Sequence, residues 1–221
     1  MTAKIVDLSM VLEEGMISFP HPWHPIVEIV QLGRHAVEGR ETRKIIMGTH
    51  TGTHIDAPRH FIPDAPTVDE IPLEQINGLA SVLDLTNFGP GDEVNVSDLD
   101  NALGDRSAER VLLRFDWERM IGSLDYYNKS PYLSENAAIW LIDKGCRLLG
   151  MDTPMPDNPA NGRGCTKDSP NHKILLGGGA ILVEYMINLA SLDKDIVHII
   201  VAPIKVKDGD GAPARVFAIL E

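Results

Sequence analysis

Three histidines and one aspartate lie within eleven residues of the chain: His50, His54, Asp56 and His60. Neutral imidazole and carboxylate groups are common ligands of Zn²⁺, and they also bind Mn²⁺ or Fe²⁺. Glycine, threonine and proline between the four groups disfavour a helix. All four groups stand at even positions, so an extended segment would point them to one side of the chain. The spacing predicts a metal site.

The ligand types in this segment indicate a catalytic metal rather than a structural one. Two imidazoles and a carboxylate leave coordination positions open, whereas a closed structural zinc site uses four protein ligands and often includes cysteine. Cys146 and Cys165 have no His or Cys partner at ligand spacing. A cysteine-based structural zinc site is therefore disfavoured.

The elements that must position these residues are mainly short strands, with few helices, in mixed order. The strongest helix pattern covers 134–145, between a cap at Ser134 and Gly145, and a shorter helix is expected over 96–103 from a cap at Ser97 and Asp98. Loops are expected at 20–25, which holds three prolines, and at 158–170. Strands are expected at 5–11, 26–33, 43–47, 79–85, 110–115, 147–151, 195–202 and 214–220. This order predicts one α/β domain on a mixed sheet, spanning 1–221.

The composition excludes several classes of function. The 221 residues include 20 Lys and Arg against 32 Asp and Glu, which gives a net charge of −12. A chain this acidic, without a long basic run, is a poor candidate for binding nucleic acid or an anionic membrane. Its first residues contain no apolar run of signal-peptide length, and two cysteines make no disulfide framework. We therefore expect a cytoplasmic protein.

The segment 50–60 matches the pattern H-x-G-T-H-x-D-x-P-x-H at all seven fixed positions. This pattern resembles the signature of the metal-dependent hydrolases of the cyclase superfamily, which includes bacterial kynurenine formamidase and isatin hydrolase. Three further segments are similar to the family's: IVDLSMVLEEG at 5–15, GMDTP at 150–154 and KVKDGDGAP at 205–213. The resemblance implies a mixed β-sheet or barrel-like core with a few helices, of the swivelling β/β/α type.

The resemblance also implies a second pair of ligands that would not stand out from the residues alone. The family has a His and a Glu twelve residues apart after the D-T-P segment, and His172 and Glu184 have that separation here. Two divalent ions, Zn or Mn, are implied, with Asp56 and Glu184 bridging them and His60 acting as the catalytic acid and base. The implied metal ligands are His50, His54, Asp56, His172 and Glu184.

The implied reaction is hydrolysis of the C–N amide bond of a small substrate, with arylformamidase as the leading subclass. In the formamidases an aromatic residue before a proline in the N-terminal loop, usually Trp, contacts the aromatic substrate. Phe19 stands at the comparable place here, and Trp23 is an alternative source of that ring. Arg163 or Lys167 is a candidate contact for a substrate carboxylate, although a solvated surface position is the favoured interpretation for both.

Other functions on the same scaffold stay open at this point. They include hydrolysis of a cyclic amide, as in isatin hydrolase, hydrolysis of a lactone or carbamate, and cyclase-type chemistry. A non-catalytic binding protein is disfavoured, because such a relative would lose His60 or a ligand and this chain keeps all six residues. The resemblance implies a homodimer or homotetramer in which N-terminal residues reach a neighbouring active site.

Overall fold

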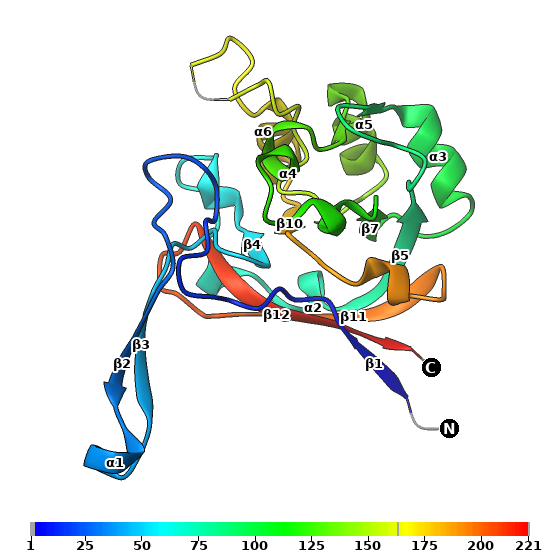
Figure 1. Cartoon of the computed structure of the whole chain (residues 1–221). Coiled ribbons are helices and arrows are strands. Elements are labelled where there is room, and N and C mark those ends of the chain that lie inside the picture. Colours follow the sequence, from blue (N-terminus) through cyan, green and yellow to red (C-terminus); the bar gives the residue numbers. More distant parts are fainter. Residues whose placement is uncertain (1–2, 163, 221) are drawn as a thin grey trace.

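The computed structural model describes residues 3–162 and 164–220, and its centre is a barrel of β-strands (Figure 1). Along the main sheet the order is β1-β12-β11-β5-β7-β9-β10-β4, and β4 pairs again with β12, so the seven strands from β12 to β4 close into a barrel. The strands β5, β7, β9 and β10 are parallel, and the other pairs are antiparallel. The strands of this sheet are β1 (Lys4–Asp7), β4 (His54–Asp56), β5 (Gly78–Asp84), β7 (Arg110–Arg114), β9 (Leu148–Met151), β10 (Ile181–Glu184), β11 (Ile196–Pro203) and β12 (Gly211–Leu220).

Two hydrophobic cores lie on the two faces of the parallel strands. Strand β7 shows why: the side chains of Val111 and Leu113 point to one face and that of Leu112 to the other, because side chains alternate along a strand. Leu112 belongs to the core inside the barrel, together with Ile55 of β4. Val111 and Leu113 belong to the core beneath the helices. Parallel strands covered on both faces are uniformly apolar, and β7 follows this rule.

Helices cover one side of the sheet (Figure 1). Helix α5 begins after Ser134, whose side chain accepts a hydrogen bond from the amide of Ala137, as expected from the sequence. Helix α3 also lies where predicted, but its cap is Asn95, which forms a capping box with Asp98, so the cap expected at Ser97 and Asp98 is wrong. The α-helices of the body are α2 (Leu73–Ile76), α3 (Val96–Leu103), α4 (Leu124–Asn128), α5 (Glu135–Asp143) and α6 (Pro170–Gly177), and the 3-10 helices are η1 (Pro58–His60), η2 (Val68–Glu70), η3 (Trp117–Met120) and η4 (Leu189–Ser191).

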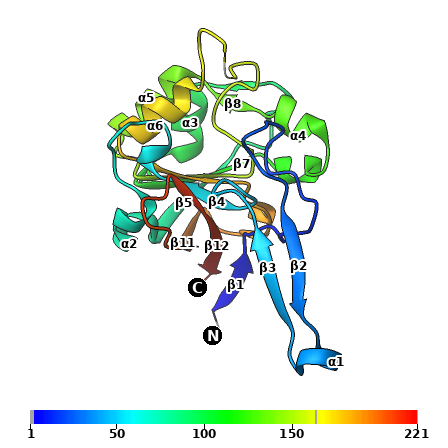
Figure 2. The same cartoon turned by 90° about the vertical axis from the view of Figure 1, so that its left-hand side faces the viewer.

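A two-stranded arm projects from the barrel (Figures 1 and 2). It consists of β2 (Glu28–Gly33), the single-turn helix α1 (His35–Glu38) and β3 (Thr42–Ile46), and β2 and β3 pair only with each other. Its apolar side chains are exposed, with Leu32 at 60% and Val37 at 72%. Another small sheet, β6 (Glu93–Val94) with β8 (Tyr132–Leu133), lies beside the helices.

Most predicted strands are present, but one strand is shorter than predicted and one helix was not predicted. The strand expected at 5–11 ends at Asp7, because the chain then turns to place Leu8 in the core. Helix α6 occupies part of a region that the sequence assigned to no element, since Pro170 pre-sets the first helical turn. None of the helices that the structure describes is long and apolar enough to cross a membrane.

Candidate metal centre

Strand β4, between β10 and β12, is the base of the site. His54 and Asp56 stand two residues apart on β4, so their side chains share a face. The pairing of β4 with β10 puts Glu184 directly opposite His54, and opposed residues in a sheet present their side chains to the same face. The strand register therefore brings Glu184 to the histidine segment. Glu184 is 4% exposed, so it is a buried residue at the end of its strand.

His50 and His60 reach the same place through irregular backbone. Even spacing would point all four side chains to one side of a fully extended segment, but only His54–Asp56 is a strand. His50 lies in the bend before β4, near Gly52 with its φ of +60°, and His60 ends the 3-10 helix η1. The ring centroids of His50 and His60 are nevertheless only 3.9 Å apart. Even spacing therefore explains the common direction of His54 and Asp56 only.

His172 lies in the first turn of α6, and the carboxylate of Asp157 holds it there. The backbone amide of Asn171 donates to Asp157 Oδ1 at 2.7 Å and that of His172 to Oδ2 at 3.2 Å. His172 Nδ1 also forms a hydrogen bond with Asp157 Oδ2. The opposite nitrogen, Nε2, lies 3.2 Å from Glu184 Oε1 and 3.5 Å from Asp56 Oδ2. Asp157 thus directs Nε2 of His172 at the two carboxylates, an arrangement common around metal ligands.

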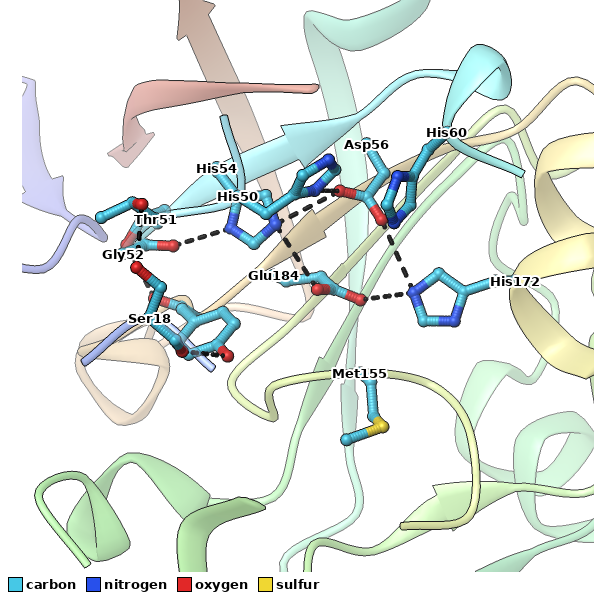
Figure 3. Close-up of polar contacts among 12 residues, drawn as sticks. Ser18, His50, Thr51, Gly52, His54, Asp56, His60, Met155, His172 and Glu184 are labelled. Atoms are coloured by element: carbon cyan, nitrogen blue, oxygen red, sulfur yellow. Dashed lines mark hydrogen bonds and ion pairs between the residues drawn. The ribbon is translucent and has the colours of Figure 1, made fainter. Parts of the chain in front are cut away.

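The predicted ligands converge on one point (Figure 3). His50 Nδ1 lies 2.7 Å from Asp56 Oδ1, and His54 Nε2 lies 3.2 Å from the same oxygen. His54 Nε2 is also 3.6 Å from Glu184 Oε2. Two sets of three residues each have ligand atoms within 4.8 Å of one another: His50, Asp56 and His60, and His54, Asp56 and Glu184. His60 lies at ligand distance too, so its assignment to proton transfer stays a prediction.

Unsatisfied polar atoms show that this cluster fits a cation. His54 Nε2, Asp56 Oδ2 and Glu184 Oε1 are buried and have no hydrogen-bond partner among the described residues. Buried polar atoms without partners are costly and rare. Three of them facing one another, two from carboxylates and one from imidazole, are what a divalent cation would satisfy.

The charges in the cluster are strongly coupled. Burial disfavours the charged form of His50, but the carboxylates of Asp56 and Asp210 outweigh burial and raise the pKa of His50 to about 10. Burial opposes ionisation of Asp56, yet His50 and His60 hold its pKa well below the ordinary value. Burial and the neighbouring Asp56 raise the pKa of Glu184. Protons therefore occupy positions where a cation would bind, so metal binding would displace them.

A cavity of about 650 Å³ opens above the cluster. Small-molecule sites typically measure about 300–1,000 Å³ and are lined mainly by apolar and aromatic groups. Both predicted ring contacts, Phe19 and Trp23, line it, and so do Phe61 and Tyr127. The ring of His21 stacks between them, 5.3 Å from Phe19 and 4.6 Å from Trp23. The wall facing the ligands is thus aromatic.

Two tyrosine hydroxyls hold the N-terminal loop against the cavity. Tyr127 donates to the carbonyl of Ile17 at 3.0 Å, and Tyr185 donates to the carbonyl of Ser18 at 2.7 Å. The ring of Tyr127 also packs edge-on against Phe19, at 5.6 Å. Sequence reasoning missed both tyrosines, because no motif or periodicity marks a residue that binds a distant backbone carbonyl.

The described charged residues of the 158–170 loop differ in where they lie. Lys167 is exposed and pairs with Glu135 at 2.7 Å, as the surface interpretation expected. Arg163 lies outside the described residues. Asp168 and Asn161 from this loop do line the cavity. The loop therefore contributes polar groups to the cavity that the aromatic residues also line.

Residues 6–158 of the chain match the family described as Putative cyclase. The chain belongs to this family. This cyclase-family protein is 28% identical to the kynurenine formamidase of Bacillus mycoides (strain KBAB4) over 214 aligned residues. The alignment covers 97% of this chain and 96% of the relative. The chain is 32% identical over 171 residues to the kynurenine formamidase of Salinibacter ruber (strain DSM 13855 / M31), which covers 76% and 75%.

Solved structures agree with this membership. Isatin hydrolase A from Labrenzia aggregata, bound to benzyl benzoate, superposes with a TM-score of 0.88 at 28% identity and covers 99% of this chain and 94% of that chain. A potential metal-dependent hydrolase with cyclase activity superposes with a TM-score of 0.79 at 26% identity, covering 100% and 99%. The cyclase-family protein is therefore an enzyme, a metal-dependent amide hydrolase that uses a divalent metal.

Proposed function

We propose that this enzyme hydrolyses N-formyl aromatic amines, releasing formate and the free amine. The observation that carries the proposal is that the aromatic rings of Phe19 and Trp23 line the same cavity as the ligand cluster. A flat ring can stack there while its N-formyl group reaches the metal centre. The formamidase names of the relatives support the same reaction.

The proposed metal ligands are His50, His54, Asp56, His172 and Glu184. Two ions, Zn²⁺ or Mn²⁺, are proposed because Asp56 and Glu184 each have one oxygen near His54 Nε2, at 3.2 and 3.6 Å, and the other near His172 Nε2, at 3.5 and 3.2 Å. A bound divalent ion lowers the pKa of a water towards about 7 and polarises the substrate carbonyl. Asp56 and Glu184 are buried, so water does not screen the attraction between their carboxylates and a bound cation.

His60 is proposed to move the proton. It lines the cavity beside the ligands, and imidazole is the side chain that most often transfers protons in catalysis. The oxygen of water bonds to the formyl carbon, the C–N bond breaks, and His60 delivers the proton taken from water to the leaving nitrogen. The products balance as one carboxylic acid and one amine.

A substrate screen tests the proposal. Purified enzyme loaded with Zn²⁺ or Mn²⁺ is offered N-formylkynurenine, N-formylaniline, isatin, an aryl lactone and an aryl carbamate, and formate or ring opening is measured. We expect the formamides to have the highest kcat/KM. The His54→Ala variant is the control for contaminating activity. Turnover confined to the lactone or carbamate would contradict the proposal.

Hydrolysis of a cyclic amide is the second candidate. It is supported by the overlap with two isatin hydrolases, from Labrenzia aggregata at a TM-score of 0.88 and from Ralstonia solanacearum at 0.90, the latter with 25% identity. In the screen this alternative predicts ring opening of isatin above formamide turnover. The same cavity would then hold the bicyclic ring.

We also propose that the enzyme is a cytoplasmic homodimer formed through the arm. The arm, 28–46, exposes Leu32 and Val37 and carries four Lys and Arg against three Glu, whereas the rest of the chain has a net charge of −13. A second copy therefore offers an acidic surface to a slightly basic, apolar arm. Both cysteines are free thiols, which suits a reducing compartment.

A further inference from the structure

A carboxylate outside the ligand cluster contacts two of its imidazoles. Oδ2 of Asp210 lies 2.9 Å from His50 Nε2 and 3.4 Å from His60 Nδ1. The Asp210 carboxylate accepts the hydrogen bond from His50 and lies at ion-pair distance from His60. One oxygen thus links the most N-terminal imidazole of the motif to the most C-terminal one.

The backbone around Asp210 is attached to the same segment that carries the ligands. The carbonyl of Asp210 accepts a hydrogen bond from the amide of Ala57 at 2.9 Å, and the carbonyl of Gly209 accepts from the amide of Val68 at 2.9 Å. The next residue, Gly211, pairs with Asp56 across β12 and β4. The position of this carboxylate is therefore fixed relative to Asp56, although 154 residues separate them in the sequence.

The contacts determine which ring nitrogen faces the reaction. A nitrogen that faces a carboxylate carries the proton, so the other nitrogen of a neutral ring has a free lone pair. In His50, Nε2 faces Asp210 at 2.9 Å and Nδ1 faces Asp56 at 2.7 Å, so a cation at the centre would take the place of the proton on Nδ1 while Asp210 keeps the one on Nε2. In His60, Nδ1 faces Asp210 and leaves Nε2 for the cavity that the ring lines.

We propose that Asp210 is a positioning residue for two rings: it directs Nδ1 of His50 to the metal centre and keeps the lone pair of His60 on Nε2. This inference rests on the proposed function for the role of His60, and it deepens that role. An aspartate that orients a catalytic histidine in one tautomer is a recurrent arrangement in hydrolases. Asp210 lies behind His50 and His60, which line the cavity, and is not itself among the described lining residues.

The test compares Asp210→Asn with Asp208→Asn. Both changes remove one negative charge from the same loop. Among the described residues, the Asp208 carboxylate makes no hydrogen bond or ion pair. The backbone of residue 208 has a φ of +56°, which asparagine tolerates. Asp210→Ala is a second variant in case the asparagine amide makes a new hydrogen bond. Thermal unfolding of all three confirms that they fold.

Three measurements are made on each protein. Zn²⁺ affinity is measured by competition with a chromophoric chelator, kcat and KM are measured at saturating Zn²⁺, and the tautomer of His60 is read from ¹⁵N chemical shifts of the Zn²⁺-loaded enzyme. For Asp210→Asn we expect Zn²⁺ binding to weaken about 10–100-fold, as for other partners of metal-bound histidines. We expect kcat to fall at least as much with KM nearly unchanged, and the proton of His60 to move from Nδ1 to Nε2.

Each contrary result overturns part of the proposal. If Asp210→Asn bound Zn²⁺ as tightly as Asp208→Asn, Asp210 would not position His50 for the metal. If Asp210→Asn had a normal kcat and an unchanged His60 tautomer at saturating Zn²⁺, Asp210 would not position His60. The affinity and ¹⁵N measurements need no substrate, so they stand even if the formamidase proposal fails.

Discussion

At the residue scale, the site combines ligands that the motif predicts with partners that it does not. His54 and Asp56 follow from local spacing on one strand, so the sequence alone predicts their common direction. Glu184 and His172 come from β10 and α6, and only the resemblance pointed to them, because strand register and helix placement are not local properties. Asp157 and Asp210 contact imidazoles through the fold; Asp157 had no sequence signal, and Asp210 lay in the family-like segment 205–213 without a predicted role.

Two histidine variants separate metal binding from proton transfer. His54→Ala removes a nitrogen from the buried centre, so we expect bound metal to be lost. His60→Ala is expected to retain metal while kcat falls about 10²–10⁴-fold, the usual contribution of general acid–base catalysis. Elemental analysis and steady-state kinetics on both variants check this. Near-wild-type kcat in His60→Ala, or loss of metal from it, would contradict its proposed role.

At the element scale, loops and helices that the sequence left irregular form the cavity. The proline-rich loop at 20–25 was predicted correctly, since three prolines prevent a helix. Its position over the cluster depends on hydroxyls of Tyr127 and Tyr185, which lie on α4 and just after β10. Short helices such as α4 have too few residues for a periodic signal, so the sequence did not predict them.

The hydroxyl of Tyr127 should matter for substrate binding more than for chemistry. Tyr127→Phe removes the hydrogen bond to the Ile17 carbonyl but keeps the ring that packs against Phe19. The loss of about 0.5–1.5 kcal/mol predicts a KM roughly 2–10-fold higher with kcat nearly unchanged. Tyr127→Ala, which removes the ring as well, should raise KM further. Equal KM values for wild type and Tyr127→Phe would show that the loop needs no such anchor.

Asp152 joins β9 to the turn after β7 and makes folding pH-dependent. Its carboxylate is fully buried and accepts hydrogen bonds from the amides of Phe115 and Trp117. Burial raises the pKa of Asp152 from 3.8 to about 7 despite these bonds. Between these two values the folded chain keeps a proton that the unfolded chain releases, so this contribution to stability is lost as pH rises.

The Asp152→Asn variant should remove that contribution. We expect the free energy of unfolding of wild type, relative to the variant, to fall by about 1.4 kcal/mol per pH unit between about pH 5 and 7. Urea unfolding at several pH values measures the difference, and far-ultraviolet circular dichroism controls for folding of the variant. Parallel stability curves for the two proteins would show that Asp152 is ionised throughout.

At the scale of the whole molecule, charge and shape divide the chain into an acidic body and an arm. The net charge of −12 disfavoured polyanion partners. The arm is an exception to this acidic character, because it carries four Lys and Arg against three Glu. The arm strands were predicted, but their separation from the barrel was not, since pairing partners depend on the complete sheet. An arm of this kind is stabilised where another surface covers Leu32 and Val37.

Charges on the arm should dissociate the proposed dimer. Leu32→Glu combined with Val37→Glu places two charges on side chains that are exposed in one copy, so the fold of that copy is not disturbed. We expect sedimentation analysis to show a dimer for wild type and a monomer for the variant. Leu73→Glu on α2, where the side chain is 64% exposed, is the matched control and should stay dimeric. A monomeric wild type would refute the arm interface.

Strand β12 has a consequence for how the protein is made. It pairs with β1, β11 and β4, and Asp210 immediately precedes it, so the last residues of the chain complete both the barrel and the support of the histidines. Ribosomes add roughly 5–20 residues per second, from the N-terminus onward. The nascent chain therefore carries the complete histidine segment, beginning at residue 50, well before β12 exists to close over it. Activity is therefore expected only after Asp210 and β12 have been synthesised and have joined the barrel.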